Sequence, residues 1–264
     1  MRYRELPENA SEMRLSPYRK DFSYSYVFGI FPVIELAENL PSALFRIILS
    51  TRISEEGLRL IRAKAAGAGA AVTFDDRTVE RLSPKENCFA IGVFSKFESS
   101  PDKAADHIVL VNPSDKGNAG NIIRTAAAFG FSDVAVIRPA ADVFDPHSVR
   151  ASMGALFRIR PSFFNTFEEY ASASGDRNYY PFMLNGSPME NTVPDRSLPC
   201  SLIFGNESAG LDKAFETIGR PVRITHTDAV DSLNLTVAAG IGMHWWRHCR
   251  PESVNAEEEA WITK

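Results

Sequence analysis

Five short apolar runs in the second half of the chain restrict the fold more than any other feature. They lack the alternation of half-exposed strands, which indicates strands covered on both faces in a parallel sheet. Segments with helical spacing lie between them, and this order predicts a doubly wound α/β domain. The runs are 108–111, 134–137, 182–184, 202–204 and 222–225, and helices are expected at 118–129, 146–153, 167–173, 211–218 and 233–248.

The first half of the chain carries a smaller α/β pattern. Pro32 stands at the first position of an expected helix, where its missing N–H costs nothing. Ser54 is a suitable N-cap for a second helix with apolar residues at helical spacing. The expected helices are 32–39, 54–68 and 75–82, and the expected strands are 45–49, 71–74 and 87–94.

A length of 264 residues fits two domains, each able to bury its own core. The stretch before His107 is polar and contains Pro101, which is the composition of a linker. The sequence is therefore divided into an extension at 1–22, a first domain at 23–98, a linker at 99–106, a second domain at 107–250 and an acidic tail at 251–264.

The composition restricts the cellular setting. The net charge of −4 differs from the strongly basic balance of an obvious nucleic-acid-binding protein, although a local patch can still be basic. Cys88, Cys200 and Cys249 are widely separated, which favours a reducing cytoplasm. The charged first residues do not form a signal peptide, and no apolar run reaches the roughly 18 residues of a membrane span.

The segment 112–124 follows an expected strand and opens a helix, and ligands bind at such junctions in parallel sheets. Asn118 suits an N-cap, and its amide can also reach a ligand. Arg124 is one turn after Gly120, and the glycine would leave room for a molecule at the guanidinium. A helix cap followed by a surface arginine explains the same spacing. No dinucleotide fingerprint and no P-loop is present.

The turn at 205–211 follows another expected strand. Gly205 allows the backbone to approach a flat ligand such as adenine. Glu207 can accept a hydrogen bond from a ribose hydroxyl or orient an arginine. It can equally be a favourable negative charge at a helix N-terminus. Both interpretations stay open at this point.

The segment 231–236 opens the last helix and allows two interpretations. Ser232 is a good N-cap, which is a purely structural role. Asn234 and Thr236, however, are polar residues in the first turn of an otherwise apolar helix and need partners, which a ligand or a second subunit would supply. Together with 205–211, this segment predicts two walls of one ligand site.

Other catalytic or metal-binding patterns are weak. His244, His248 and Cys249 resemble a metal cluster in spacing, but they lie in the last turns of a helix, where histidine suits the helix dipole. No carboxylate or second cysteine is near them in the sequence, so we expect no metal site. No G-x-S-x-G hydrolase motif occurs.

In order and spacing, three motifs over residues 107–250 resemble the SpoU (TrmH-like) family of RNA ribose 2′-O-methyltransferases, in the SPOUT superfamily. The segment 23–98 resembles the ribosomal-protein-like RNA-binding domain that often precedes this catalytic domain. The three motifs are 118–130 (NAGNIIRTAAAFG), 205–211 (GNESAGL, preceded by Phe204) and 232–241 (SLNLTVAAGI).

The resemblance implies a trefoil-knotted α/β fold that binds S-adenosyl-L-methionine, a homodimer with active sites near the interface, and an rRNA or tRNA substrate. It implies that Arg124 contacts the RNA phosphate and helps to activate the ribose hydroxyl. Asn118, Glu207 and Asn234 would shape the site around it. The implied cofactor contacts are Gly205, Ile224, Ser232 and Leu233, with Leu184 as a further contact.

Two other functions remain open on the sequence. One is an RNA-binding or ribosome-assembly factor that keeps the fold without catalysis, and the other is an unrelated nucleotide-binding enzyme, against which the missing phosphate loop counts. RNA contact would depend on local basic clusters, each of which can also be a solvated surface. These clusters are Arg2, Arg4, Arg14, Arg19 and Lys20, and separately Arg59, Arg62 and Lys64.

Overall fold

The computed structural model describes residues 1–6, 13–83 and 87–249, and the predicted tail at 251–264 lies outside this part of the chain. The first unit is a four-stranded sheet in the order β2-β5-β3-β4, in which the β3–β4 pair is parallel and the others are antiparallel. Its elements are β2 (Tyr24–Phe28), α1 (Ile30–Asn39), η1 (Pro41–Ala43), β3 (Leu44–Leu49), α2 (Glu55–Ala65), η2 (Ala66–Ala68), β4 (Ala71–Phe74), α3 (Asp76–Leu82) and β5 (Ala90–Ser95).

This unit agrees with the sequence in most elements and differs at its start. The side chain of Ser54 accepts a hydrogen bond from the Gly57 amide and caps α2, as predicted. The first helix begins two residues earlier than expected, at Ile30, so that Pro32 is at its third position. Strand β2 was not assigned from the sequence, because its alternating Tyr and Ser give no clear apolar run.

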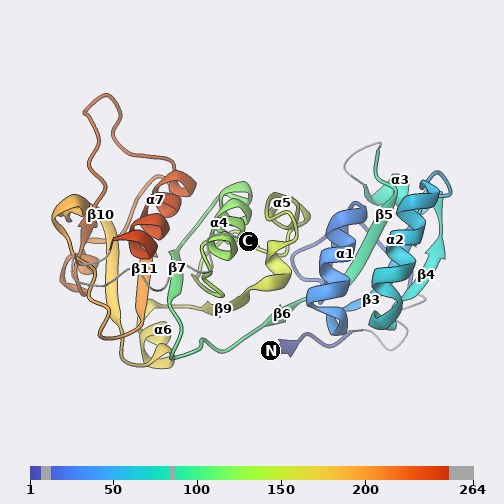
Figure 1. The fold of residues 1–264 in the computed structure, drawn as a ribbon, viewed down its shortest axis with the longest axis horizontal. Helices are drawn as coiled ribbons and strands as arrows, with labels where there is room; N and C mark the ends of the chain where they lie inside the picture. The colour runs from blue at the N-terminus through green and yellow to red at the C-terminus, as the bar shows by residue number, and fades with distance from the viewer. Residues whose placement is uncertain (7–12, 84–86, 250–264) are drawn as a thin grey trace.

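The second unit is a six-stranded, wholly parallel sheet in the order β12-β10-β11-β7-β8-β9 (Figure 1). This confirms the predicted α/β class with a parallel sheet. A separate two-stranded ribbon pairs β1 (Arg2–Tyr3) with β6 (Phe97–Glu98). The elements of the second unit are β7 (His107–Val111), α4 (Lys116–Ala128), β8 (Asp133–Ile137), α5 (Pro146–Ala151), η3 (Ala155–Arg158), β9 (Arg160–Phe164), α6 (Phe167–Ser174), β10 (Asn178–Pro188), η4 (Met189–Asn191), β11 (Cys200–Phe204), η5 (Lys213–Thr217), β12 (Val222–Arg223) and α7 (Leu235–His248).

Successive strand residues pack on opposite faces of this sheet. In β7, Ile108 and Leu110 belong to the core beneath α4 and α7, whereas Val109 and Val111 belong to the core beneath α6. Figure 1 shows α4, α5 and α7 on one side of the strands and α6 on the other. Both faces are covered, which is why the strands read as continuous apolar runs. No helix in the described part of the chain is long and apolar enough to cross a membrane.

Two expectations for this unit were wrong. Strand β9 was missed, because it starts with Arg160, Pro161 and Ser162 and has no apolar run. The segment 211–218 forms a short 3-10 turn, η5, instead of an α-helix.

The two units share a continuous core and polar contacts. Phe94 of β5 packs edge-on against Phe157 of η3, with ring centroids 5.1 Å apart. The ammonium of Lys96, buried between the units, donates to Asp142 at 3.3 Å. Burial lowers the pKa of Lys96, which the Asp142 carboxylate opposes. The predicted linker therefore connects two units that pack on each other.

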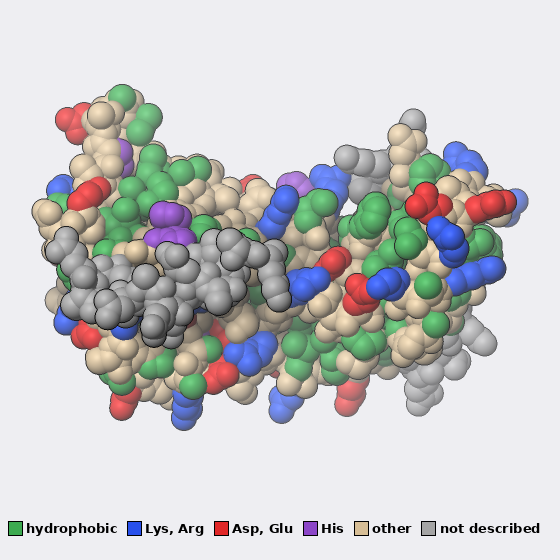
Figure 2. Space-filling view, in the orientation of Figure 1, with side chains coloured by type: hydrophobic (Ala, Val, Ile, Leu, Met, Phe, Trp, Pro, Cys, Tyr) green, Lys and Arg blue, Asp and Glu red, His purple; other side chains and the backbone are tan. Residues whose placement is uncertain are grey.

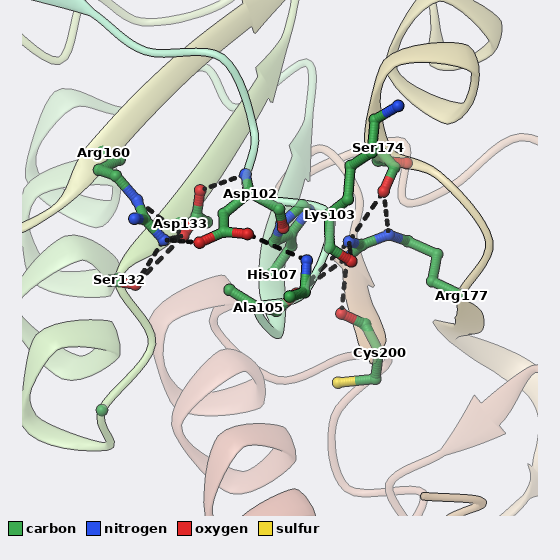
Figure 3. Close-up of polar contacts among 12 residues, drawn as sticks. Asp102, Lys103, Ala105, His107, Ser132, Asp133, Arg160, Ser174, Arg177 and Cys200 are labelled. Atoms are coloured by element: carbon green, nitrogen blue, oxygen red, sulfur yellow. Dashed lines mark hydrogen bonds and ion pairs between the residues drawn. The ribbon is translucent and has the colours of Figure 1, made fainter. Parts of the chain in front are cut away.

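Polar side chains gather at the amino ends of the parallel strands, where Figure 3 shows Arg160 bound to Asp133 and Arg177 bound to the carbonyls of Ser174 and Cys200. A buried polar chain continues from Arg177. Arg177 donates to Ser201 Oγ at 3.2 Å, Ser201 is 2.5 Å from the Tyr170 hydroxyl, and Tyr170 is 2.8 Å from Nδ1 of His107. Nε2 of His107 is 2.8 Å from the Asp102 carbonyl. Burial keeps the imidazole of His107 neutral, so Nε2, which faces the Asp102 carbonyl, carries the proton and Nδ1 accepts from the Tyr170 hydroxyl. The Tyr170 oxygen then accepts from Ser201.

We expect acid to destabilise the protein through His107. Burial, followed by the nearby Arg177 charge, lowers its pKa to about 4. An unfolded histidine takes up a proton near pH 6.5, so between these values the unfolded state binds more protons and the free energy of unfolding falls as pH falls. The loss by pH 4 is about 3 kcal/mol.

Urea unfolding between pH 7 and 4.5 measures this loss. His107→Gln removes the titration and should flatten the dependence, whereas His147→Gln, at an exposed position on α5, should retain the wild-type slope. An unchanged slope in His107→Gln would assign the effect to other groups.

Candidate functional site

A cavity of about 440 Å³ opens at the carboxyl ends of β10, β11 and β12. This is the edge at which parallel α/β sheets bind ligands, and the volume suits a small molecule or cofactor. All five residues predicted to contact a cofactor lie in its wall. They are Leu184 after the middle of β10, Gly205 after β11, Ile224 after β12, and Ser232 and Leu233 before α7.

Other lining residues were not found from the sequence. The rings of Phe182 and Phe204 stack 4.7 Å apart at the floor of the cavity. Lys213 and Glu216 of η5 bring charges to the wall, and Glu216 accepts a hydrogen bond of 2.6 Å from Asn185. The aromatic residues stood within predicted strands, but the polar residues follow no motif, so the sequence contained no signal for them.

Gly205 is required by the turn itself. A Cβ at this position would lie 2.2 Å from the carbonyl carbon of Gly210. Asn206 and Gly210 form an antiparallel bridge that closes the turn, and Gly210 has a φ of 68°, which favours glycine. The predicted close backbone approach exists, but the approaching group is the chain itself.

Glu207 binds the start of α4, 93 residues earlier in the chain. One carboxylate oxygen accepts from the amide and hydroxyl of Ser114, at 2.9 and 2.7 Å. The other accepts from the amide of Asp115 at 3.0 Å and from Nδ2 of Asn118 at 3.2 Å. Partial burial raises the pKa of Glu207, but the hydrogen bonds from Ser114 and Asp115 outweigh it and lower the pKa to about 2. The carboxylate is therefore ionised at the N-terminus of α4. The sequence had instead suggested a helix at 211–218, directly after Glu207.

Asn118 links the starts of α4 and α7. Its amide nitrogen donates to Glu207, and its oxygen accepts from Asn234 at 3.4 Å and from Thr236 at 3.1 Å. The expected caps were wrong at both helices, because Asp115 caps α4 and Asn234 caps α7, in place of Asn118 and Ser232. Asn234 and Thr236 were expected to find hydrogen-bond partners in a ligand or a second subunit. Asn118 is their partner instead. Three of the four predicted catalytic residues thus form one hydrogen-bonded group.

Arg124, the fourth, lies outside this group on the exposed side of α4. No hydrogen bond or ion pair of its side chain is found within the described residues. The space beside Gly120, expected to admit a ligand, is filled by α5: a Cβ there would lie 2.3 Å from the Ser148 carbonyl oxygen and 2.6 Å from Ala151 Cβ. The glycine therefore allows two helices to pack closely. Arg124, Asn118 and Asn234 are not among the described residues that line the cavity.

Comparison with known proteins assigns the family. The SpoU rRNA Methylase family profile matches residues 106–244, more than half of the chain. The chain belongs to the SpoU rRNA methylase family. An AdoMet-bound rRNA methyltransferase from Sinorhizobium meliloti superposes with a TM-score of 0.74 at 27% identity, covering 85% of this chain and 87% of that one. The α/β methyltransferase fold is therefore shared.

Two curated SpoU relatives are more similar in sequence over a shorter length. A 23S rRNA (uridine(2479)-2′-O)-methyltransferase of Streptomyces viridochromogenes is 34% identical over 143 residues, 50% of this chain and 48% of the relative. A 23S rRNA (guanosine(2553)-2′-O)-methyltransferase of Bacillus subtilis is 33% identical over 141 residues, 52% of this chain and 56% of the relative. The chain thus spans about half the length of these relatives.

The histidines near the end of α7 do not form a larger metal-binding group in this SpoU chain. His244 and His248 stack with ring centroids 4.4 Å apart, and His244 also contacts Phe129. Within the described ranges, no group of three or more His, Cys, Asp or Glu side chains is placed to hold a metal ion.

The packing at Gly120 in this SpoU domain predicts a specific loss of stability. Gly120→Ala places a methyl group against the backbone of α5, so the helices must separate, and we expect the free energy of unfolding to fall by about 1–3 kcal/mol. Urea denaturation measures it. Gly67→Ala is the matched control, because its Cβ would meet nothing within 4 Å. Equal stabilities of the two variants would contradict the packing role.

Proposed function

We propose that this protein transfers a methyl group from S-adenosyl-L-methionine to a ribose 2′-hydroxyl of structured RNA, either rRNA or tRNA. The observation that carries the proposal is the cavity at the carboxyl edge of the sheet, in whose wall all five expected cofactor residues meet. Family membership, the ribose methyltransferase names of the relatives and the AdoMet-bound structural neighbour support it.

The cavity residues fit this cofactor. S-adenosyl-L-methionine has a flat adenine, a ribose diol, a positive sulfonium and a zwitterionic amino acid end. Apolar walls from Ile224, Leu233 and Phe204 suit adenine, and carboxylates at Glu216 and Asp231 suit hydroxyl, ammonium and sulfonium groups. Lys213 supplies a cation for the carboxylate end. The bound cofactor would supply a methyl group activated by the sulfonium charge.

Arg124 would position the RNA in this reaction. Its guanidinium keeps its proton and, without a partner among the described residues, is available to bind a phosphate. Binding next to the target ribose would orient the 2′-oxygen in line with the methyl group, and such orientation can supply several kcal/mol. As the new O–C bond replaces the methyl–sulfur bond, the proton of the 2′-hydroxyl would pass to the adjacent phosphate or to water. Glu207, Asn118 and Asn234 would hold α4 and α7 in place.

The proposal includes the organisation that the family resemblance implies. Residues 23–98 would bind the RNA substrate, with the extension 1–22 and the linker 99–106 around them, and residues 107–250 would form the methyltransferase domain. We further propose a trefoil knot in this domain, a cytoplasmic location and a homodimer. The dimer is supported by the outer side of α7, where Val237 is half exposed.

We expect Arg124→Ala to lower the rate of methyl transfer about 100-fold or more, because the RNA loses its positioning charge. The assay measures tritium transfer from labelled S-adenosyl-L-methionine to rRNA and tRNA, and mass spectrometry of RNA hydrolysates identifies 2′-O-methyl nucleosides. Lys103→Ala, which removes an exposed cation at the amino ends of the parallel strands, is the control and should retain the wild-type rate.

Two outcomes would contradict the proposal. Wild-type rates in Arg124→Ala would remove Arg124 from the mechanism. Calorimetry that shows no S-adenosyl-L-methionine binding to the wild type would reject the enzyme and favour a non-catalytic RNA-binding factor.

A further inference from the structure

The seam between the two units carries an exposed face of which the proposed chemistry uses only Arg124. Glu35 of α1 forms an ion pair of 2.8 Å with Arg158 of η3 across this seam. The neighbouring Gly154 is so close to α1 that a Cβ would lie 2.8 Å from Glu35 Cβ. The helix α1 and the segment from α5 to η3 therefore lie side by side, as Figure 1 also shows.

Two large apolar side chains border the seam in solvent. Phe31, one turn before Glu35 on the same side of α1, is 73% exposed. Met153, directly before Gly154, is 55% exposed and has a φ of 51°, a left-handed conformation that is rare for a non-glycine residue. Such strained positions concentrate at functional sites.

Two arginines continue the same face toward α4. Arg150 on α5 directly precedes Ala151, whose Cβ would meet a Cβ at Gly120. Arg124 is one turn after Gly120 on α4, so both arginines flank the contact between α4 and α5. Both residues are exposed, and within the described ranges neither side chain has an ion pair or hydrogen bond. Figure 2 shows basic and hydrophobic side chains next to one another where the two halves of the molecule meet.

We infer that this face binds unpaired RNA nucleotides next to the methylated one, with Phe31 stacking on a base and Arg150 contacting a phosphate. We name the face, made of Phe31, Met153, Arg150 and Arg124, the seam face. The inference rests on the proposed function. It specifies that the RNA substrate is single-stranded next to the methylated nucleotide, on the side that faces α1.

The chemistry of the seam face matches single-stranded RNA. Every base offers a flat surface for an aromatic ring, and cations beside the ring bind the backbone. The bases of a duplex are stacked on each other, so a duplex leaves Phe31 without a partner. A protein partner would have to leave two unpaired arginines in its contact, unless it supplied carboxylates. On a protein with a net charge of −4, two free arginines favour an anionic ligand.

Fluorescence anisotropy with a labelled oligoadenylate of about 12 nucleotides, and with an RNA duplex of the same length, tests the inference on the full chain. We expect Phe31→Ala to weaken binding of the single strand about tenfold and to change duplex binding little. Phe31→Trp should restore affinity, and its fluorescence should be quenched by the stacked base. Arg150→Gln should weaken binding and reduce the slope of log affinity against log salt by about 0.7.

Matched controls lie at the amino ends of the parallel strands, away from the cavity. Leu198→Ala removes another exposed apolar side chain, shortly before β11, and Lys103→Gln removes an exposed cation shortly before β7. Both should bind the single strand with wild-type affinity. Circular dichroism of all variants verifies that they are folded.

The outcomes separate this inference from the proposed function. Wild-type affinity of Phe31→Ala for the single strand would overturn the inference, even if the enzyme binds its cofactor and methylates RNA. A change in self-association of Phe31→Ala by sedimentation, with unchanged RNA binding, would instead identify a protein interface and also overturn it. A wild type that binds neither RNA nor S-adenosyl-L-methionine would reject the proposed function itself.

Discussion

The arrangement of the site depends on the Glu207 carboxylate at the start of α4. Its two oxygens accept hydrogen bonds from Ser114, Asp115 and Asn118. Burial raises its pKa, but the hydrogen bonds from Ser114 and Asp115 outweigh burial and lower the pKa to about 2, so the carboxylate stays charged. Because Asn118 also accepts from Asn234 and Thr236, the loop after β11 and the starts of α4 and α7 form one unit. A cavity wall and the helix that carries Arg124 are thereby held together.

A second contact connects this unit to the rest of the molecule. The helix α4 packs on α5 at Gly120, and η3, just after α5, pairs with α1 through Arg158 and Glu35. Arg124 and Phe31, 93 positions apart in the chain, are thereby connected through α5 and η3. In the proposed function, the first unit would hold the RNA that flanks the nucleotide presented to the cavity.

Much of the architecture could be predicted from local patterns. Continuous apolar runs indicated the parallel strands correctly, because both faces of the sheet are buried. The pattern failed where packing overrides composition: β9 begins with Arg160, Pro161 and Ser162, yet it pairs with β8 along its length. Residues near the glycine-rich turns were found in the cavity wall, whereas Lys213, Glu216 and Asn185 were missed because isolated polar residues resemble ordinary surface.

Local sequence patterns were sufficient to predict the fold class, the family and the chain segments from which the cavity is built, since these depend on apolar periodicity and on motifs of neighbouring residues. The contacts of each motif residue became visible only in the folded chain. Gly120 and Gly205 proved to be needed for contacts between chain segments, and Glu207 proved to bind a helix 93 residues away. The physical reason is that hydrogen bonds and close packing act over a few ångströms, and only folding brings distant residues to that range.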